Sequence, residues 1–104
     1  MTSSWSAIHF SNLSGAKVRP AVVVSAPHPS QDIFIVPLTS KTAPLLPGEF
    51  PLADWNAEGL NVATAVKRGL YTIHQTLIVK TVGRLSPPDA SQLLRSLREW
   101  LGIS

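Results

Sequence analysis

Residues 14–25 read SGAKVRPAVVVS, and this stretch decides the fold because a turn runs directly into an apolar strand. The opening serine and glycine favour a turn, whereas the valine run over 20–25 is typical of a buried strand. Lys17 and Arg19 stand where that strand begins, and a sheet interior does not accept unpaired cations. We therefore expect both cations at the rim of the sheet, with Arg19 as the first candidate for a functional residue.

Other strands are expected on both sides of this one. Residues 5–10 indicate a first strand, and 32–38 indicate one that forms an antiparallel hairpin with 20–25 around a proline-rich loop. Pro51 restricts residues 50–52 to an edge position, because proline cannot donate to a ladder. Further candidates are a strand at 61–67 and short strand or turn segments at 77–79 and 82–85.

The C-terminal segment predicts one helix. Ser86 suits the N-cap, Pro87 the first helical position, and Asp89 the acidic position of a capping box. Gly102 suits the C-terminal stop. Five apolar residues then fall at helical spacing on one expected face: Leu93, Leu94, Leu97, Trp100 and Leu101. The sequence therefore predicts a mainly β protein with one C-terminal helix on a small sheet.

Length and composition favour a single domain over residues 1–104. No apolar run is long enough to span a membrane, and the first residues lack the basic and apolar regions of a signal peptide. The absence of cysteine excludes a disulfide framework and a thiolate metal site. We expect a cytoplasmic protein with no membrane partner.

The charged residues are unevenly spread. The formal net charge is +3, and residues 1–31 and 59–88 contain cations but no acid. Four of the six acids fall between these stretches: Asp32, Glu49, Asp54 and Glu58. Two acid-free stretches that converge would form a basic face suited to a polyanion such as nucleic acid, or to an acidic peptide.

No common enzyme motif is present. His9, His28 and His74 lack the short spacings of a zinc site, so we expect surface or loop histidines, no metal and no cofactor. Antiparallel pairing places the start of 20–25 beside the end of 32–38, which brings Arg19 near the Thr39 hydroxyl. A guanidinium binds phosphate bidentately and stays charged, so this pair predicts a phosphate clamp.

These residues also resemble a known family. Residues 14–25, the segment IVPLTS at 35–40, and the segments at 59–73 and 82–86 are similar, in this order, to the signatures of the MazF/PemK (Kid) toxins. The resemblance implies a small SH3-like β-barrel and a homodimer. It also implies a metal-independent, sequence-specific endoribonuclease that cleaves single-stranded RNA as the toxin of a type II toxin–antitoxin system.

The resemblance also implies roles for particular residues. Arg19 falls on the family's catalytic arginine and Thr39 on its assisting hydroxyl. The expected substrate-binding residues are Lys17, Ser40, Lys67 and Arg68. The expected partners are an acidic antitoxin and the RNA substrate, and the toxin–antitoxin complex is expected to bind operator DNA.

The chain departs from the family pattern in several places. Leu13 and Ser14 replace a Glu or His of the first loop, Arg68 occupies an acidic position with no carboxylate expected nearby, and His74 stands where an Asp is frequent. The first strand is also shortened, which predicts an exposed edge for a partner copy or an antitoxin segment to cover. Three alternatives stay open: a catalytically weakened member that only binds RNA or antitoxin, a gyrase-directed toxin like the CcdB relatives, and a small barrel adaptor.

Overall fold

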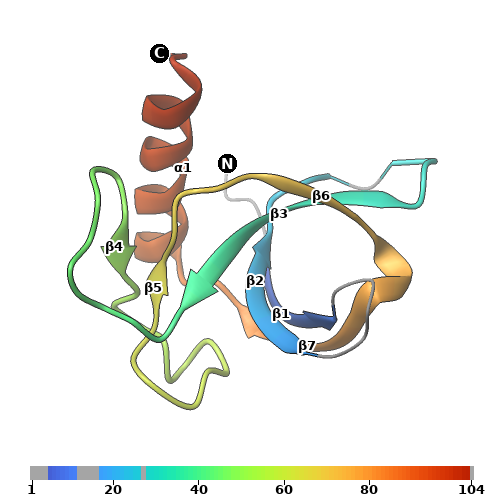
Figure 1. Ribbon diagram of the computed structural model, residues 1–104, viewed down its shortest axis with the longest axis horizontal. Helices are drawn as coiled ribbons and strands as arrows, with labels where there is room; N and C mark the ends of the chain where they lie inside the picture. Colours follow the sequence, from blue (N-terminus) through green and yellow to red (C-terminus); the bar gives the residue numbers. More distant parts are fainter. Residues whose placement is uncertain (1–4, 12–16, 27, 104) are drawn as a thin grey trace.

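The computed structural model describes residues 5–11, 17–26 and 28–103. The fold is built on a strongly curled antiparallel sheet, and a C-terminal helix packs against one side of it (Figure 1). The elements, in chain order, are β1 (Ser6–Ser11), β2 (Val18–Val23), β3 (Asp32–Thr39), β4 (Phe50–Pro51), β5 (Ala65–Val66), β6 (Tyr71–His74), a 3-10 turn (Gln75–Leu77), β7 (Ile78–Arg84) and α1 (Pro87–Leu101).

The sheet is built around β2 and β3. Its strand order is β4-β5-β3-β2-β1-β7, and β6 pairs with β3 over residues 32–35. The predicted hairpin between the valine-rich strand and its successor is confirmed, with Val22 opposite Val36. Within the described residues β6 and β7 do not pair with each other. The predicted SH3-like barrel is therefore a curled sheet that stays open between these two strands.

Strand alternation divides the core into two clusters. Val22, Val36 and Leu38 face α1 and pack with Leu93 and Leu97 of the helix. Ile8, Ala21 and Ile35 face the opposite way and fill the inside of the curl. The period of two along each strand explains this division, because neighbouring residues such as Ala21 and Val22 point to opposite sides. The prediction of a fully buried strand over 20–25 is right only for Ala21 and Val22, because Val23 and Val24 are half-buried.

Several predicted boundaries are wrong. The strand expected at 61–67 shortens to Ala65–Val66, because residues 61–62 form a bend and Thr64 Oγ1 donates to the Val62 carbonyl there. The segments at 77–79 and 82–85 are one continuous strand, β7, and the pairing of 71–74 with β3 was not predicted. Pro51 lies in the edge strand β4, as predicted.

The first strand does not form an open edge. Residues 6–11 of β1 pair with β2 on one side and with β7 on the other. The prediction of an exposed edge at this strand is wrong, since β7 covers it. The β1–β7 ladder carries register shifts after Ala7 and after His9, which bend the sheet there.

The helix begins and ends where the sequence predicts. Ser86 accepts a hydrogen bond from the Asp89 N–H at 3.4 Å, and Gly102 adopts the left-handed conformation at φ 70°. In the expected capping box the Asp89 side chain would accept the Ser86 N–H. Glu58 takes this part instead, because the Ser86 N–H donates to Glu58 Oε2 at 2.7 Å. Leu94 and Leu101 were expected on the packed face, but they are 41% and 53% exposed. No helix of the described part of the chain is long and apolar enough to cross a membrane.

The loop from 40 to 49 is held against the helix by two hydrogen bonds. Trp100 Nε1 donates to the Pro47 carbonyl at 3.0 Å, and Ser96 Oγ donates to the Gly48 carbonyl at 2.7 Å. Gly48 has φ 85°, and a Cβ added to it would overlap the Trp100 indole nitrogen. Both the backbone conformation and the contact with Trp100 therefore require glycine.

Gly48→Ala is expected to lower the free energy of unfolding by about 2–4 kcal/mol, from backbone strain and steric overlap together. Gly102→Ala is the matched control, because Gly102 also has positive φ but has open space around it. For Gly102→Ala the free energy of unfolding is expected to fall only by the contribution of backbone strain, about 1–2 kcal/mol. Urea unfolding of the three proteins measures both values, and equal losses would show that the Trp100 contact contributes nothing.

Candidate functional site: a cationic hollow at one end of the sheet

The start of β2 and the end of β3 lie side by side. The β2–β3 register ends with Ala21 opposite Pro37. Beyond this pair Arg19 lies opposite Phe10 of β1, and Thr39 lies opposite Ala65 of β5. Arg19 and Thr39 each lie two residues beyond the last β2–β3 pair, so they lie at the same end of the sheet.

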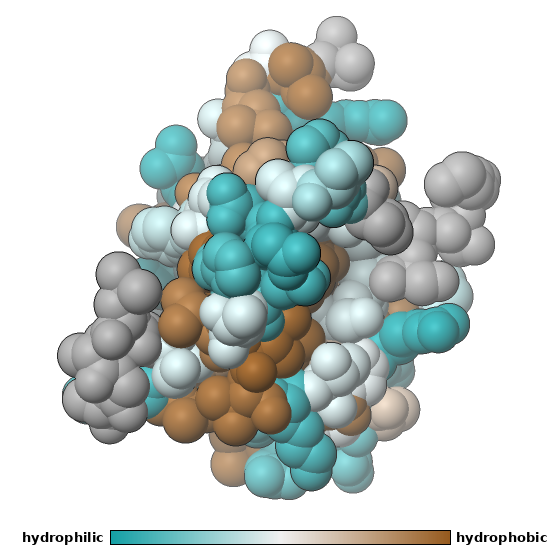
Figure 2. Space-filling model, turned by 90° about the vertical axis from the view of Figure 1, so that its right-hand side faces the viewer, coloured by the Kyte–Doolittle hydropathy of each residue, from teal (hydrophilic) through white to brown (hydrophobic). Residues whose placement is uncertain are grey.

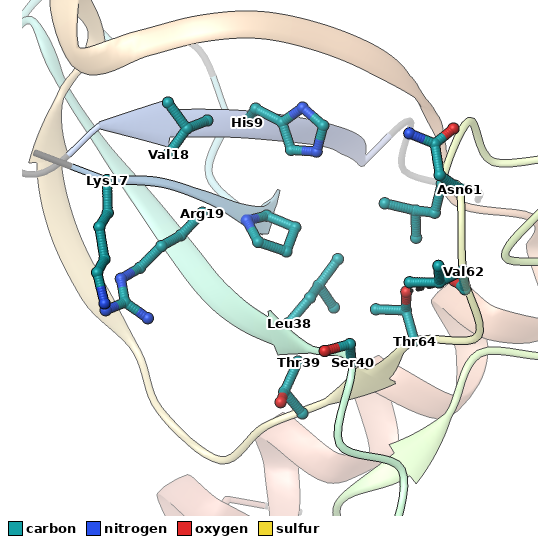
Figure 3. Close-up of a pocket in the computed structure, with 12 residues that line it drawn as sticks. His9, Lys17, Val18, Arg19, Leu38, Thr39, Ser40, Asn61, Val62 and Thr64 are labelled. Atoms are coloured by element: carbon teal, nitrogen blue, oxygen red, sulfur yellow. Dashed lines mark hydrogen bonds between the residues drawn. The ribbon is translucent and has the colours of Figure 1, made fainter.

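A hollow of about 470 Å³ lies at this end. Its walls come from the second half of β1, the start of β2, the end of β3 and the segment before β5 (Figure 3). The lining residues are His9, Lys17, Val18, Arg19, Pro20, Leu38, Thr39, Ser40, Leu60, Asn61, Val62 and Thr64. We call it the cationic hollow, because these lining residues include two cations and no carboxylate.

Four of the six predicted site residues line the cationic hollow: Lys17, Arg19, Thr39 and Ser40. Figure 3 shows the Lys17 and Arg19 side chains running alongside each other, with Thr39 and Ser40 at the end of β3. Lys67 and Arg68 do not line it. Both are exposed beyond β5, and Arg68 borders a separate small hollow with Leu97 and Trp100 of the helix.

The Thr39 hydroxyl is oriented by the backbone that follows it. The Lys41 N–H donates to Thr39 Oγ1 at 3.1 Å. Because the oxygen accepts this bond, its own hydrogen is free to donate to another group. Thr39 therefore offers a positioned donor in the same hollow as the Arg19 guanidinium, and both kinds of group stabilise a phosphoryl oxygen.

Sequence reasoning missed part of this wall. His9 was expected on the surface or in a loop, but it lies half-buried within β1 and lines the cationic hollow. Pairing the strand expected at 5–10 with the strand that begins at Pro20 could have placed His9 in the site, because His9 lies opposite Pro20, next to Arg19. The turn carrying Asn61 and Thr64 was also missed. Thr64 Oγ1 donates to the Val62 carbonyl at 2.8 Å, a local bond that stiffens this turn.

A carboxylate does lie near Arg68, contrary to the prediction. Glu49 accepts the Arg68 N–H at 2.9 Å and the Leu46 N–H at 2.8 Å, and the first of these bonds does most to hold the pKa of Glu49 below its ordinary value. Glu49 lies outside the cationic hollow. It ties the 40–49 loop to the segment after β5, which is a structural role.

Three carboxylates gather below the helix N-terminus: Asp54, Glu58 and Asp89. Asp89 accepts N–H bonds from Ala53 at 3.0 Å and from Asp54 at 3.1 Å, so both its oxygens are occupied. Glu58 Oε1 is buried without a partner, and burial raises the pKa of Glu58 to about 7. Backbone donors and the positive end of the helix dipole disfavour a metal cation there, so the cluster suits a bound proton instead.

The fold and the site define a small, β-rich protein with a phosphate-compatible hollow at a sheet end. A family model for the PemK-like, MazF-like toxin of type II toxin–antitoxin systems matches residues 8–101. The chain belongs to this PemK/MazF-like toxin family. A search of curated proteins finds no significant match.

Two solved structures from mycobacteria have the same fold. The "Mycobacterium tuberculosis toxin MazF-mt6" superposes with a TM-score of 0.76 at 21% identity, covering 94% of this chain and 98% of that chain. The "Endoribonuclease in complex with its cognate antitoxin from Mycobacterial species" gives a TM-score of 0.78 at 17% identity, covering 99% and 98%. At these identities the likeness supports the fold, which agrees with the predicted class.

Proposed function

We propose that this toxin is a metal-independent endoribonuclease that cleaves single-stranded RNA at the cationic hollow. The observation that carries the proposal is that Lys17, Arg19, Thr39 and Ser40 line one hollow whose described walls contain no carboxylate. A neighbour with this fold is an endoribonuclease by its own description, and family membership makes the same activity reasonable here. The gyrase-directed alternative is less favoured, because the matching family is the PemK/MazF-like one.

The proposed chemistry uses the RNA itself as the nucleophile. The ribose 2′-oxygen attacks the adjacent phosphorus, the bond from phosphorus to the 5′-oxygen breaks, and a 2′,3′-cyclic phosphate and a 5′-OH result. The 2′-oxygen loses a proton to an acceptor and the 5′-oxygen gains one from a donor. DNA lacks the nucleophile, so it is a poor substrate.

Each polar lining residue has a proposed part in this reaction. The Arg19 guanidinium binds the non-bridging phosphate oxygens, stabilises the charge that grows on them, and donates to the leaving 5′-oxygen. The Thr39 hydroxyl donates to a phosphoryl oxygen, since the Lys41 N–H already occupies its acceptor side. Lys17 and Ser40 hold the RNA backbone, and Lys67 and Arg68 are proposed to contact RNA outside the hollow.

The biological setting is proposed in the same way. An acidic antitoxin would neutralise the acid-free cationic hollow, and the neighbour solved with its cognate antitoxin supports such a partner. We further propose a homodimer, binding of the toxin–antitoxin complex to operator DNA, and action in the cytoplasm. Size-exclusion chromatography with light scattering tests the dimer, and a monomeric toxin that still cuts RNA would exclude it as a requirement.

The direct test is to incubate the purified protein with single-stranded RNA in the presence of a chelator and to map the new 5′ ends. Thr39→Val is expected to slow cleavage by about 10–100-fold, because it removes one positioned donor from the phosphate site. Thr39→Ser is the matched control, since it keeps the hydroxyl and is expected to stay within a few fold of the original rate. Equal rates for Thr39→Val and the unchanged protein would remove Thr39 from the mechanism.

A further inference from the structure

A second hollow opens inside the curl of the sheet, on the other side of Arg19. It measures about 580 Å³, and its walls include Phe10, Ile35 and Ile73 of three different strands. Tyr71 and His74 of β6 stand at its border. Figure 2 views the side of the molecule where β6 leads into β7 and shows an apolar area bordered by hydrophilic residues. We call the cavity of about 580 Å³ the apolar hollow.

Arg19 is the one described residue that lines both hollows. The register explains this position, because Arg19 pairs with Phe10 and so points to the same side of the sheet as the inner core cluster. His9 and Pro20 point to the opposite side, toward the cationic hollow. A phosphate held by Arg19 would therefore lie at the boundary between a polar and an apolar compartment.

The border of the apolar hollow offers a ring face and a defined hydrogen-bond donor. Tyr71 is 56% exposed although it is a large aromatic residue. The Thr76 N–H lies 3.3 Å from His74 Nδ1 and the Thr76 hydroxyl lies 2.8 Å from it, and this nitrogen accepts both bonds in the tautomer that carries its proton on Nε2. His74 Nε2 is then the protonated nitrogen, and it is available as a donor.

We propose that the apolar hollow binds one unpaired nucleobase of the RNA, next to the phosphate that Arg19 holds. The base stacks on Tyr71 and turns a hydrogen-bond acceptor toward His74 Nε2. This inference rests on the proposed ribonuclease function and deepens it, because it names the site that reads the nucleotide adjoining the cut. A base within a duplex is stacked and paired, so the hollow also accounts for a preference for single strands.

A nucleobase fits this hollow better than a peptide side chain does. Phosphate and base belong to the same nucleotide, so one nucleotide of a nucleic acid can reach both adjoining hollows. Its phosphate meets Arg19 and its base meets the aromatic and aliphatic wall. An aliphatic side chain of a protein partner would fill the wall but would bring no anionic group to Arg19.

The test uses short RNAs that span a mapped cut site and carry a 2′-deoxy sugar there, so that they bind without being cut. Fluorescence anisotropy measures their Kd with an intact base or with an abasic residue on either side of the cut. For the unchanged protein, one abasic position is expected to weaken binding about tenfold or more. Tyr71→Ala is expected to weaken binding of the intact RNA by a similar factor and to be insensitive to that abasic residue.

Two control variants separate stacking from other effects. Tyr71→Phe keeps the ring and is expected to retain both the affinity and the abasic penalty. Val79→Ala changes another exposed apolar residue, 58% exposed on β7 and outside the lining, and is expected to change neither. His74→Leu is expected to alter which base is preferred beside the cut, whereas His74→Gln, which keeps a donor, is expected to preserve the preference.

Each outcome decides between the proposals. An abasic penalty that is the same in Tyr71→Ala as in the unchanged protein overturns the base site while leaving the ribonuclease intact. If Tyr71→Ala keeps its RNA affinity but loses affinity for the antitoxin, the apolar hollow is a protein-docking surface instead. If the unchanged protein neither binds nor cuts RNA, both this inference and the proposed function fail.

Discussion

Arg19→Ala is expected to lower the rate of RNA cleavage by about 10²–10³-fold, the loss that follows removal of one preorganised group at a developing negative charge. The variant loses both the fixed charge and the bidentate donors at the boundary of the two hollows. Because Arg19 is exposed at the start of β2, its removal is expected to leave stability within about 0.5 kcal/mol. Single-turnover cleavage of one labelled RNA measures the effect on the chemical step.

Two arginine controls sharpen this experiment. Arg19→Lys keeps the charge without the planar fork, so it is expected to recover only part of the lost rate. Arg84→Ala removes an exposed arginine of β7 that lines neither hollow, and it is expected to leave the rate unchanged. Cleavage by Arg19→Ala at the original rate would show that another residue is responsible. Growth arrest by that variant without RNA cleavage would favour a gyrase-directed toxin.

The buried Glu58 is expected to make stability depend on pH. Burial is the main cause that raises the pKa of Glu58 from 4.5 to about 7, the Ser86 N–H opposes it, and nearby Asp89 adds to it. Between these values the folded protein keeps a proton that the unfolded chain has lost. The free energy of unfolding therefore falls as pH rises from 4.5 to about 7, by up to about 3 kcal/mol, and this contribution is constant above that range.

Glu58→Gln isolates this effect, because the amide keeps an acceptor for the Ser86 N–H and cannot ionise. It is expected to unfold with a free energy about 1–3 kcal/mol higher than the unchanged protein at pH 8, and within about 0.5 kcal/mol of it at pH 4.5. Glu99→Gln, at an exposed position of α1, controls for loss of a carboxylate and is expected to show no such difference. Parallel stability curves for Glu58→Gln and the unchanged protein would exclude Glu58 as the titrating group.

Strong local signals predicted the fold well. The valine run, the prolines that end or restrict strands, and the Ser86 and Gly102 caps each act within a few residues, so sequence alone placed the β2–β3 hairpin and the helix. β6 was missed because its partner β3 lies far away in the chain and its own four residues have no clear period. The helix face was predicted too wide, since spacing cannot tell that the sheet covers Leu93 and leaves Leu94 exposed.

The sequence predicted the site residues whose positions follow from strand pairing. It did not predict those whose positions depend on the path of loops and of β6. Arg19 and Thr39 follow from a hairpin register, and the structure brings both to the cationic hollow. Lys67 and Arg68 were chosen for charge and resemblance, but the chain turns them away from this hollow. The apolar hollow depends on the path of β6 across the curl, which no local pattern in the sequence indicates.

The most direct measurement of the central claim is the chemical identity of the RNA ends that the purified toxin produces in the presence of a chelator. We expect a 5′-OH on one product and a 2′,3′-cyclic phosphate on the other, with no cleavage when a 2′-deoxy sugar replaces the ribose at the cut. Products with 5′-phosphate ends, or cleavage at the 2′-deoxy position, would contradict attack by the 2′-oxygen at the Arg19 site.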